Sequence, residues 1–460
     1  MGRTVLADDA IQDYVDKLIK NSPWNLGLII GQLTTQKDYA VRLIRTPEPV
    51  EDEVSEEEFE EDSTLDTAKK RRKSDHRPES LSDADEKWAA THAKQVIRML
   101  PGGIDVIGVF ALASPNMMQA AQAKLRQILF AIHKTLVKGQ VVPEEGGITD
   151  RILLQICSST RKYTCRSIDV GDPKSSFRPA DWKNHSGGDH WLCLRSDIAI
   201  DLRIPVPVRS QNQTFLKQLQ SGITPYCKRL CGGIALFNGK LREPTESLDQ
   251  SESKGRGKGR DKGQPTQQIQ EIEFCIKPEA DNESEARVVE NVAKMAVCGC
   301  IHSRAYVYGK AEVRDGIKAL QADVVRSLMA RCELLYEDVI DVVEEESVMK
   351  ELYNTPVRVF GKLPGTQLDF CDYMFPDEKM EEVTDRIEEL LDLSITEEKL
   401  DFTCERMATE EDMATTEDID SESNSEDLKK SNLGFNIGTV IGGVVAAALA
   451  GLSYYILGET

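Results

Sequence analysis

Residues 101–115 read PGGIDVIGVFALASP, an apolar run between two pairs of residues that break or start helices. The Pro-Gly pair at the start ends a helix predicted for 88–100, and the Ser-Pro pair at the end is a typical start for a helix predicted over 117–136. Between the two pairs, the apolar run 104–112 predicts a buried strand. A helix, a buried strand and a second helix in succession indicate an α/β domain.

The chain before this strand adds a helix and a hairpin. Residues 8–20 carry apolar side chains at helical spacing, and 26–33 and 39–44 are apolar, β-branched runs separated by polar turn residues. Residues 46–86 are first acidic, then basic, then rich in serine and aspartate, which predicts a disordered insertion. Together these segments predict one α/β (α+β) domain over 1–145.

A second α/β domain is predicted over 146–395. Its strands are predicted at 151–157, 163–170, 191–204, 233–238, 269–276, 357–360 and 368–374, and its helices at 211–231, 312–341 and 375–393. Within this domain, 243–268 is polar and rich in lysine, glycine and arginine, which predicts a disordered loop. Residues 396–432 are strongly acidic and predict a flexible tether.

The uncharged run from Phe435 to Leu457 is long enough to cross a bilayer. About 23 residues at 1.5 Å each give roughly 34 Å of helix, against about 30 Å of hydrocarbon. We therefore expect a single transmembrane helix over 433–457. Lys429 and Lys430 precede the run, so the positive-inside preference predicts a tail anchor with the N-terminal region in the cytosol.

Small residues within this predicted helix recur at intervals of four. Such a stripe lets another transmembrane helix approach closely, so we predict helix packing there. The residues concerned are Gly434, Gly438, Gly442 and Gly443.

Composition excludes one broad class of function. A net charge of -21 on 460 residues argues against a generic nucleic-acid binder, so no nucleic-acid partner is expected. The 11 cysteines are irregularly spaced and no apolar signal segment opens the chain, which indicates reduced thiols in the cytosol.

Two strands of the first domain resemble those of an MPN domain, the fold of the JAMM metalloproteases that remove ubiquitin. The matching residues are Gly27-Leu-Ile-Ile-Gly31 and Gly108-Val-Phe-Ala-Leu-Ala-Ser-Pro115. Active members place a His-x-His pair, a downstream Asp and a Glu around a zinc-bound water. Ala111 and Ala113 stand where the histidines would fall. The resemblance thus implies a catalytically dead domain, a pseudoenzyme, without metal, cofactor or catalytic residue.

Two other groups of residues have the chemistry of metal ligands or nucleophiles. The first is His185, Asp189, His190 and Cys193, whose Gly-Gly centre predicts a structural turn. The second is Cys298, Cys300 and His302, which lacks a fourth ligand. Neither spacing is typical of a zinc site or a Cys/His catalytic pair, so no enzyme is predicted.

Nearly the whole chain resembles the odorant response abnormal protein four family. The resemblance rests on residues 23–32, 101–110, the Ser-Gly-Gly-Asp-His turn at 186–190 and the glycine-rich terminal run. It implies a non-enzymatic, single-pass protein of the endoplasmic reticulum membrane that assists folding or trafficking of a subset of G-protein-coupled receptors. It further implies a role in ufmylation, the attachment and removal of the ubiquitin-fold modifier. In this role the chain is an adaptor that holds at the membrane the cysteine protease which removes the modifier.

Two alternatives remain open from the residues. A direct chaperone would pack the glycine face of its anchor against client helices. A cysteine hydrolase of the modifier would rest on the scattered Cys and His residues alone.

Overall fold

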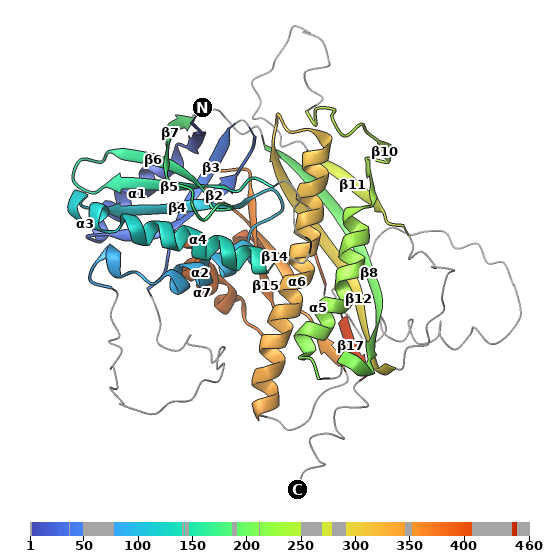
Figure 1. Cartoon of the computed structure of the whole chain (residues 1–460). Coiled ribbons are helices and arrows are strands. Elements are labelled where there is room, and N and C mark those ends of the chain that lie inside the picture. The colour runs from blue at the N-terminus through green and yellow to red at the C-terminus, as the bar shows by residue number, and fades with distance from the viewer. Residues whose placement is uncertain are drawn as a thin grey trace, which may run out of the picture.

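The computed structural model describes residues 2–35, 37–48, 78–139, 142, 147–185, 191–210, 212–249, 269–277, 291–345, 352–406 and 444–448. They form two α/β units side by side, which we call the N-terminal unit (2–185) and the C-terminal unit (191–406) (Figure 1). Both units contain β-sheet and helix, so the predicted mixed α/β (α+β) class is confirmed.

The sheet of the N-terminal unit closes on itself as a barrel of seven described strands. The continuous apolar runs of β2 and β4 are buried along nearly their whole length, because packed side chains cover both of their faces. β4 pairs with β2 antiparallel and with β5 parallel. In order around the barrel, the strands are β1 (Thr4–Asp8), β3 (Asp38–Arg45), β2 (Asn25–Gln32), β4 (Asp105–Ala113), β5 (Asp150–Cys157), β6 (Tyr163–Asp169) and β7 (Arg178–His185).

Helices pack on two sides of this sheet. α1 (Ala10–Asn21) buries Val15 and Leu18 in an apolar cluster with Ile29 of β2 and Ile107 of β4. α2 (Glu86–Arg98) and α4 (Gln122–Lys138) pack on the opposite face of these strands, after the short η1 (Leu81–Asp83) and α3 (Pro115–Ala120). The helix predicted for 117–136 is thus two helices, with the break at the buried Ala121.

The C-terminal unit is built on two long antiparallel strands, β8 (Trp191–Pro207) and β12 (Asn291–Tyr308). From residue 197 onward, β8 alternates strictly between exposed and buried residues, because α5 (Phe215–Cys231) and α6 (Val313–Glu345) cover one face of the sheet. The sheet order is β10 (Lys240–Leu241), β9 (Ile234–Phe237), β11 (Ile269–Cys275), β8, β12, β17 (Val444–Ala448) and β13 (Leu352–Asn354).

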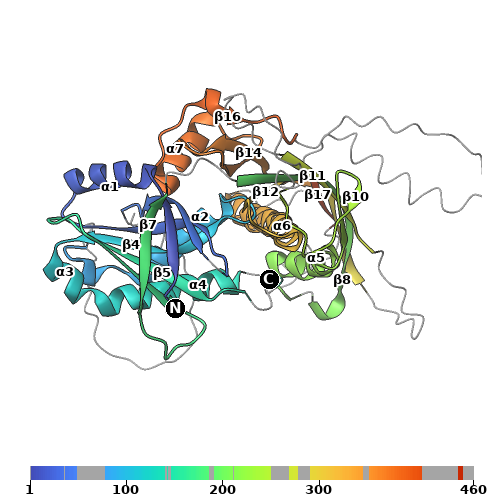
Figure 2. The ribbon, with the colours of Figure 1, turned by 90° about the horizontal axis from the view of Figure 1, so that it is seen from above.

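A third, small sheet belongs to the C-terminal unit and packs against the N-terminal unit. It contains β15 (Asp369–Met374), β14 (Val357–Lys362) and β16 (Leu400–Asp401), with α7 (Met380–Leu391) packed beside it (Figure 2). Val383 and Ile387 of α7 belong to the same apolar core as α2 and α4. The short turns η2 (Val208–Ser210) and η4 (Glu397–Lys399) complete the described helical elements.

The ordered parts extend beyond several predicted boundaries. β5, β6 and β7 continue the first sheet past residue 145. Leu81 and Ala84, inside the insertion predicted at 46–86, are fully buried, and so is Leu248 of the predicted loop 243–268. Leu400 of the predicted tether pairs with β14. The remaining parts of these three segments, 49–77, 250–268 and 407–432, lie outside the described residues.

The transmembrane helix predicted over 433–457 is described only at Val444–Ala448. These five residues form a strand, β17, between β12 and β13, because an apolar valine and alanine run can pair its backbone groups there. The packing positions Gly434, Gly438, Gly442 and Gly443 lie outside the described residues. Among the described helices, none is both long and apolar enough to cross a membrane.

His92 of α2 links the N-terminal core to α7 and is 2% exposed. Its Nδ1 lies 3.2 Å from the Thr46 hydroxyl and its Nε2 lies 2.9 Å from the Leu390 carbonyl. Burial lowers the pKa of His92 to about 4, against 6.5 in an exposed histidine. Between these two pKa values, His92 is protonated in the unfolded chain and neutral in the folded chain.

We expect His92 to make stability depend on pH. Its contribution is complete above pH 6.5 and is lost as the pH falls toward 4, at a cost of roughly 2 to 3 kcal/mol. Denaturation curves of the wild type and of His92→Gln at about pH 7 and pH 4.5 should show a smaller acid-induced loss in the variant. Equal losses in both proteins would contradict this role.

Candidate functional site

The carboxyl ends of β4 and β5 form the first candidate site. Ala111 and Ala113 are fully buried on β4, and Ala113 lies beside Cys157 of the parallel strand β5. The turn after β5 donates the Ser158 amide to the Ala113 carbonyl at 3.0 Å and places Arg161 at φ 56. The side chains here are thus methyl groups, hydroxyls, a thiol and a guanidinium, and the described residues contain no group of three side chains that could hold a metal ion.

Cys157 is a feature that the sequence pattern did not indicate. Its Sγ lies 3.3 Å from the Ser159 hydroxyl and accepts the Thr160 amide at 3.4 Å. These hydrogen bonds lower the pKa of Cys157 to about 7. The signal for it, a Cys-Ser-Ser-Thr turn closing a strand, is too common to stand out in a sequence.

The structure describes two members of the first group of candidate ligands, His185 and Cys193. Cys193 is fully buried on β8 opposite Tyr306, and burial raises the pKa of its thiol. The His185 Nε2 lies 3.3 Å from the Tyr308 hydroxyl. Asp189 and His190 lie outside the described residues. Cys193 therefore cannot act as an exposed nucleophile in this conformation.

The second group shares one face of β12. Cys298, Cys300 and His302 alternate along the strand and pair with Asp201, Ala199 and Asp197 of β8. The Cys298 thiol donates to Asp201 at 3.4 Å, and the His302 Nδ1 lies 2.6 Å from the Asp197 carboxylate. The Cys298 and His302 side chains are thus bonded to their cross-strand neighbours.

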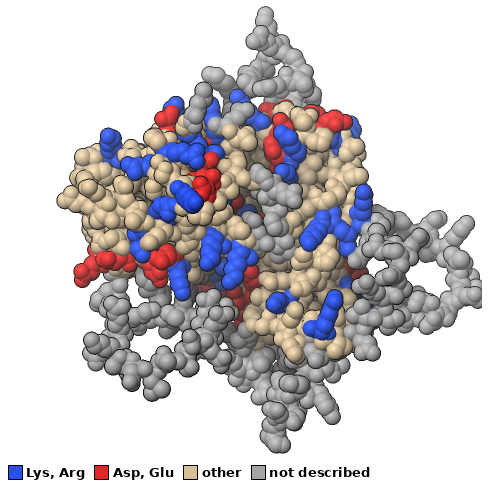
Figure 3. Space-filling model, in the orientation of Figure 1, with Lys and Arg blue, Asp and Glu red and all other residues tan. Residues whose placement is uncertain are grey.

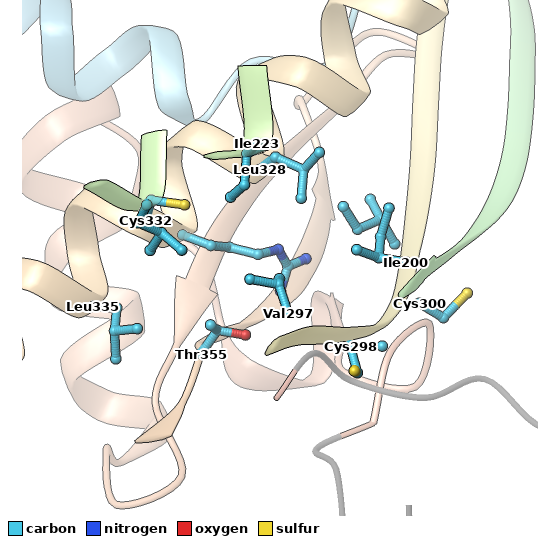
Figure 4. A pocket seen from close by; sticks show the side chains of 13 residues that line it. Ile200, Ile223, Val297, Cys298, Cys300, Leu328, Cys332, Leu335 and Thr355 are labelled. Atoms are coloured by element: carbon cyan, nitrogen blue, oxygen red, sulfur yellow. The ribbon is translucent and has the colours of Figure 1, made fainter. Parts of the chain in front are cut away.

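An apolar cavity lies between this part of β12 and the helices α5 and α6 (Figure 4). Its water-accessible volume is ≈ 30 Å³, room for little more than a water molecule or two. Figure 4 shows the sulfur atoms of Cys298 and Cys300 pointing away from the apolar side chains around the cavity. Its chief polar group, Arg331, is bonded to Glu405 and to the Pro356 carbonyl. The cavity does not fit a substrate.

The most concentrated polar chemistry is a buried charge network where the units meet. Asp323 of α6 is fully buried and accepts both Nη atoms of Arg358, at 2.7 and 2.8 Å. It also accepts the Ser303 hydroxyl at 2.7 Å and the backbone amide of Gly102 at 3.0 Å. Burial alone would raise the pKa of Asp323, but the Arg358 charge and these hydrogen bonds hold it below its ordinary value.

Two further buried pairs complete the network. Arg331 binds Glu405 at 2.5 Å, and Glu405 also accepts the backbone amides of Arg358 and His302. Arg304 binds Asp369 at 2.7 Å. Buried pairs of this kind contribute little net stability, but they fix the geometry because a displaced charge would be left without a partner.

The Pro-Gly-Gly segment supplies the N-terminal side of this junction. Gly102 forms a parallel bridge with Ala305 of β12, and a Cβ there would lie 2.1 Å from the Ala319 carbonyl oxygen. Gly103 has φ 78, and a Cβ there would lie 2.1 Å from the Tyr306 carbonyl oxygen. The two glycines therefore permit a close backbone approach between the units.

Two side chains hold the same segment from either side. Gln32 of β2 donates to the carbonyls of Gly103 and Tyr306 at 3.0 and 3.2 Å. Arg326 of α6 donates to the Leu100 carbonyl at 3.1 Å, at the end of α2. The junction is thus a continuous set of contacts between two fixed units, and its polar groups are bonded to one another.

Comparison with known proteins identifies relatives along the whole chain. The model of the family described as ODR4-like, Odorant response abnormal 4-like, matches residues 27–402. "Protein odr-4 homolog" of Homo sapiens is 32% identical over 476 aligned residues that cover 100% of both chains, and the Mus musculus protein of that name is 32% identical over 474. "Odorant response abnormal protein 4" of Caenorhabditis elegans is 24% identical and covers 73% of this chain and 69% of its own.

One solved structure shows a weak likeness to this chain. It is titled "Crystal structure of UfSP from C.elegans" and aligns with a TM-score of 0.45 at 8% sequence identity. The alignment covers 85% of this chain and 56% of that one. A likeness at this level does not establish a shared fold.

Proposed function

The chain belongs to the odorant response abnormal 4-like family, and from this premise we propose that it is a non-enzymatic, tail-anchored adaptor of the endoplasmic reticulum membrane. Its folded part recruits the cysteine protease specific for the ubiquitin-fold modifier, and it assists trafficking of a subset of G-protein-coupled receptors. One observation carries the proposal: the alignment with the human relative runs over all of both chains, the apolar run at 435–457 included. In the anchored form that we propose, the five residues of β17 leave the sheet and join the membrane helix.

The chemistry of the candidate sites supports a role without catalysis. At the ends of β4 and β5, Ala111 and Ala113 offer no metal ligand, and no described carboxylate neighbours the Cys157 thiol as a base. Cys193 is enclosed in the core. A hydrolase needs a nucleophile and a base within hydrogen-bond reach, and the hydrogen bonds of the Cys157 thiol go to Ser159 and Thr160, which are not bases.

An anchored adaptor works by raising the local concentration of a soluble partner at the membrane. Co-purification from mild detergent, with bound proteins identified by mass spectrometry, tests this directly. The full chain and a form ending at Lys430 should retain the same protease in similar amounts. Absence of any protease from both preparations would overturn the proposal. Cys193→Ala serves as the control for the hydrolase alternative and should leave partner binding and modifier cleavage unchanged.

The glycine spacing of the predicted anchor favours one second candidate, a direct chaperone. If Gly438 and Gly442 pack against client helices, Gly438→Leu with Gly442→Leu should reduce receptor export while protease binding stays intact. Surface delivery of an odorant-type receptor is the measurement. Unchanged delivery would count against direct helix packing and leave the adaptor role standing.

A further inference from the structure

Two long stretches of this acidic chain contain no acidic residue. The first runs from Val106 to Pro143 and the second from Leu202 to Arg242. Their basic residues are Lys124, Arg126, Lys134 and Lys138 in the first, and Arg203, Arg209, Lys217, Lys228, Arg229, Lys240 and Arg242 in the second. In a chain with a net charge of -21, such stretches concentrate positive charge locally.

The fold brings the two stretches to one side of the molecule. The first supplies α4 of the N-terminal unit and the second supplies α5 of the C-terminal unit. Figure 1 shows both helices at the front, and Figure 2, turned by 90°, shows both along the same edge. α1 and α7 lie toward the opposite side (Figure 2). We call this side the α4–α5 face.

The α4–α5 face presents lysines that have no partner among the described residues. Lys134, Lys138, Lys217 and Lys228 are exposed, and no described carboxylate forms an ion pair with them. Figure 3 shows blue side chains across both halves of this face, with fewer red ones, which lie at its lower left, at its upper right and among the blue ones in the left half. The bordering acids Glu333 and Glu337 of α6 are already paired with Arg98.

Exposed apolar groups accompany these lysines. Val137 of α4 is 45% exposed beside Lys134 and Lys138, over a shallow hollow lined also by Phe130, Ala131 and Val170. Val208, just before α5, is 40% exposed. Positive charge together with isolated exposed aliphatic groups is typical of a surface that rests on lipid headgroups. A nucleic-acid surface would instead add aromatic stacking platforms.

We propose that the α4–α5 face docks on an anionic lipid surface and orients the folded body on the bilayer. A chain of this net charge is repelled by anionic lipid in most orientations, so the face built from its two acid-free stretches is the one that can approach. Each lysine near such a surface strengthens binding by a factor of about 5. The face spans both units, which the buried charge network holds in a fixed relation, so a flat surface can contact both helices together.

Vesicle sedimentation of the full chain tests this proposal. We expect binding to phosphatidylcholine vesicles that contain about 30% phosphatidylserine to exceed binding to pure phosphatidylcholine by about 10-fold or more. The excess should fall below about 2-fold at about 1 M salt, because the Debye length shrinks to about 3 Å. The comparison between lipids isolates the electrostatic effect from any insertion of the apolar tail.

A pair of charge-matched variants identifies the face responsible. The face variant carries Lys134→Glu, Lys138→Glu, Lys217→Glu and Lys228→Glu. The control variant carries Lys17→Glu, Lys20→Glu, Lys379→Glu and Lys399→Glu, four exposed lysines on or beside α1, α7 and η4. Their denaturation midpoints should match, which shows that both fold.

The face variant should lose the phosphatidylserine-dependent excess while the control retains most of it. Equal loss in both variants, or retention in the face variant, would overturn the proposal. So would binding of a single-stranded RNA through these lysines without any response to phosphatidylserine.

Discussion

Asp323→Ala should lower the free energy of unfolding by about 3 to 5 kcal/mol, the cost of leaving a buried charge without its partner. The guanidinium of Arg358 is fully buried and directs both Nη atoms at Asp323. Without the carboxylate, this cation, the Ser303 hydroxyl and the Gly102 amide all lose their acceptor. The loss therefore acts on both units together.

Chemical denaturation of the wild type and the variant measures this effect. Asp16→Ala is the matched control, since the Asp16 and Arg161 side chains are 38% and 59% exposed and their surface pair should contribute less than about 1 kcal/mol. A shift for Asp323→Ala no larger than that of the control would contradict the role assigned to the network.

Gly103→Ala should cost more than about 3 kcal/mol and loosen the junction between the units. Its new Cβ would lie 2.1 Å from the carbonyl oxygen of Tyr306, which belongs to β12 and cannot move without displacing that strand. The positive φ of 78° adds a backbone strain of roughly 1 to 2 kcal/mol.

Gly239 is a control that distinguishes the steric clash of a new Cβ from the backbone strain of a positive φ. It has a similar φ of 72°, but a Cβ there would meet nothing within 4 Å. Gly239→Ala should therefore cost only the strain. Denaturation midpoints and the rate of limited proteolysis between the units are the measurements. Equal effects at Gly103 and Gly239 would show that the close approach is unimportant.

The sequence predicted best those elements whose burial is continuous or periodic. β2 and β4 are enclosed on both faces, so their apolar runs stand out. α1 and α6 match the helical period read from 8–20 and 312–341. These signals are local, and no distant partner is needed to interpret them.

The elements that were missed depend on distant partners. β7 is mostly polar and exposed, and it is a strand because it pairs with β1 at the other end of the unit. Residues 396–406 resemble a solvated acidic tether, yet Glu405 is buried because Arg331 and two backbone amides surround it. An acidic stretch is therefore expected to be exposed to solvent only if none of its carboxylates pairs with a buried cation.

The candidate sites were predictable only as residue types. The Pro-Gly-Gly segment predicts the end of a helix, and the structure adds that its glycines admit another backbone at close range. The sequence does not predict that Asp323 and Arg358 form an ion pair, because their pairing depends on the packing of α6 against β14.

If the folded part of this chain holds a soluble protease at a membrane, as we propose, the membranes should lose that protease when the chain is absent. The quantity to measure is the fraction of the ubiquitin-fold-modifier protease that sediments with endoplasmic reticulum membranes from cells that lack the chain. We expect this fraction to fall, and we expect the full chain to restore it while the form ending at Lys430 does not. A protease that stays with the membranes in the absence of the chain would show that this chain does not hold it there.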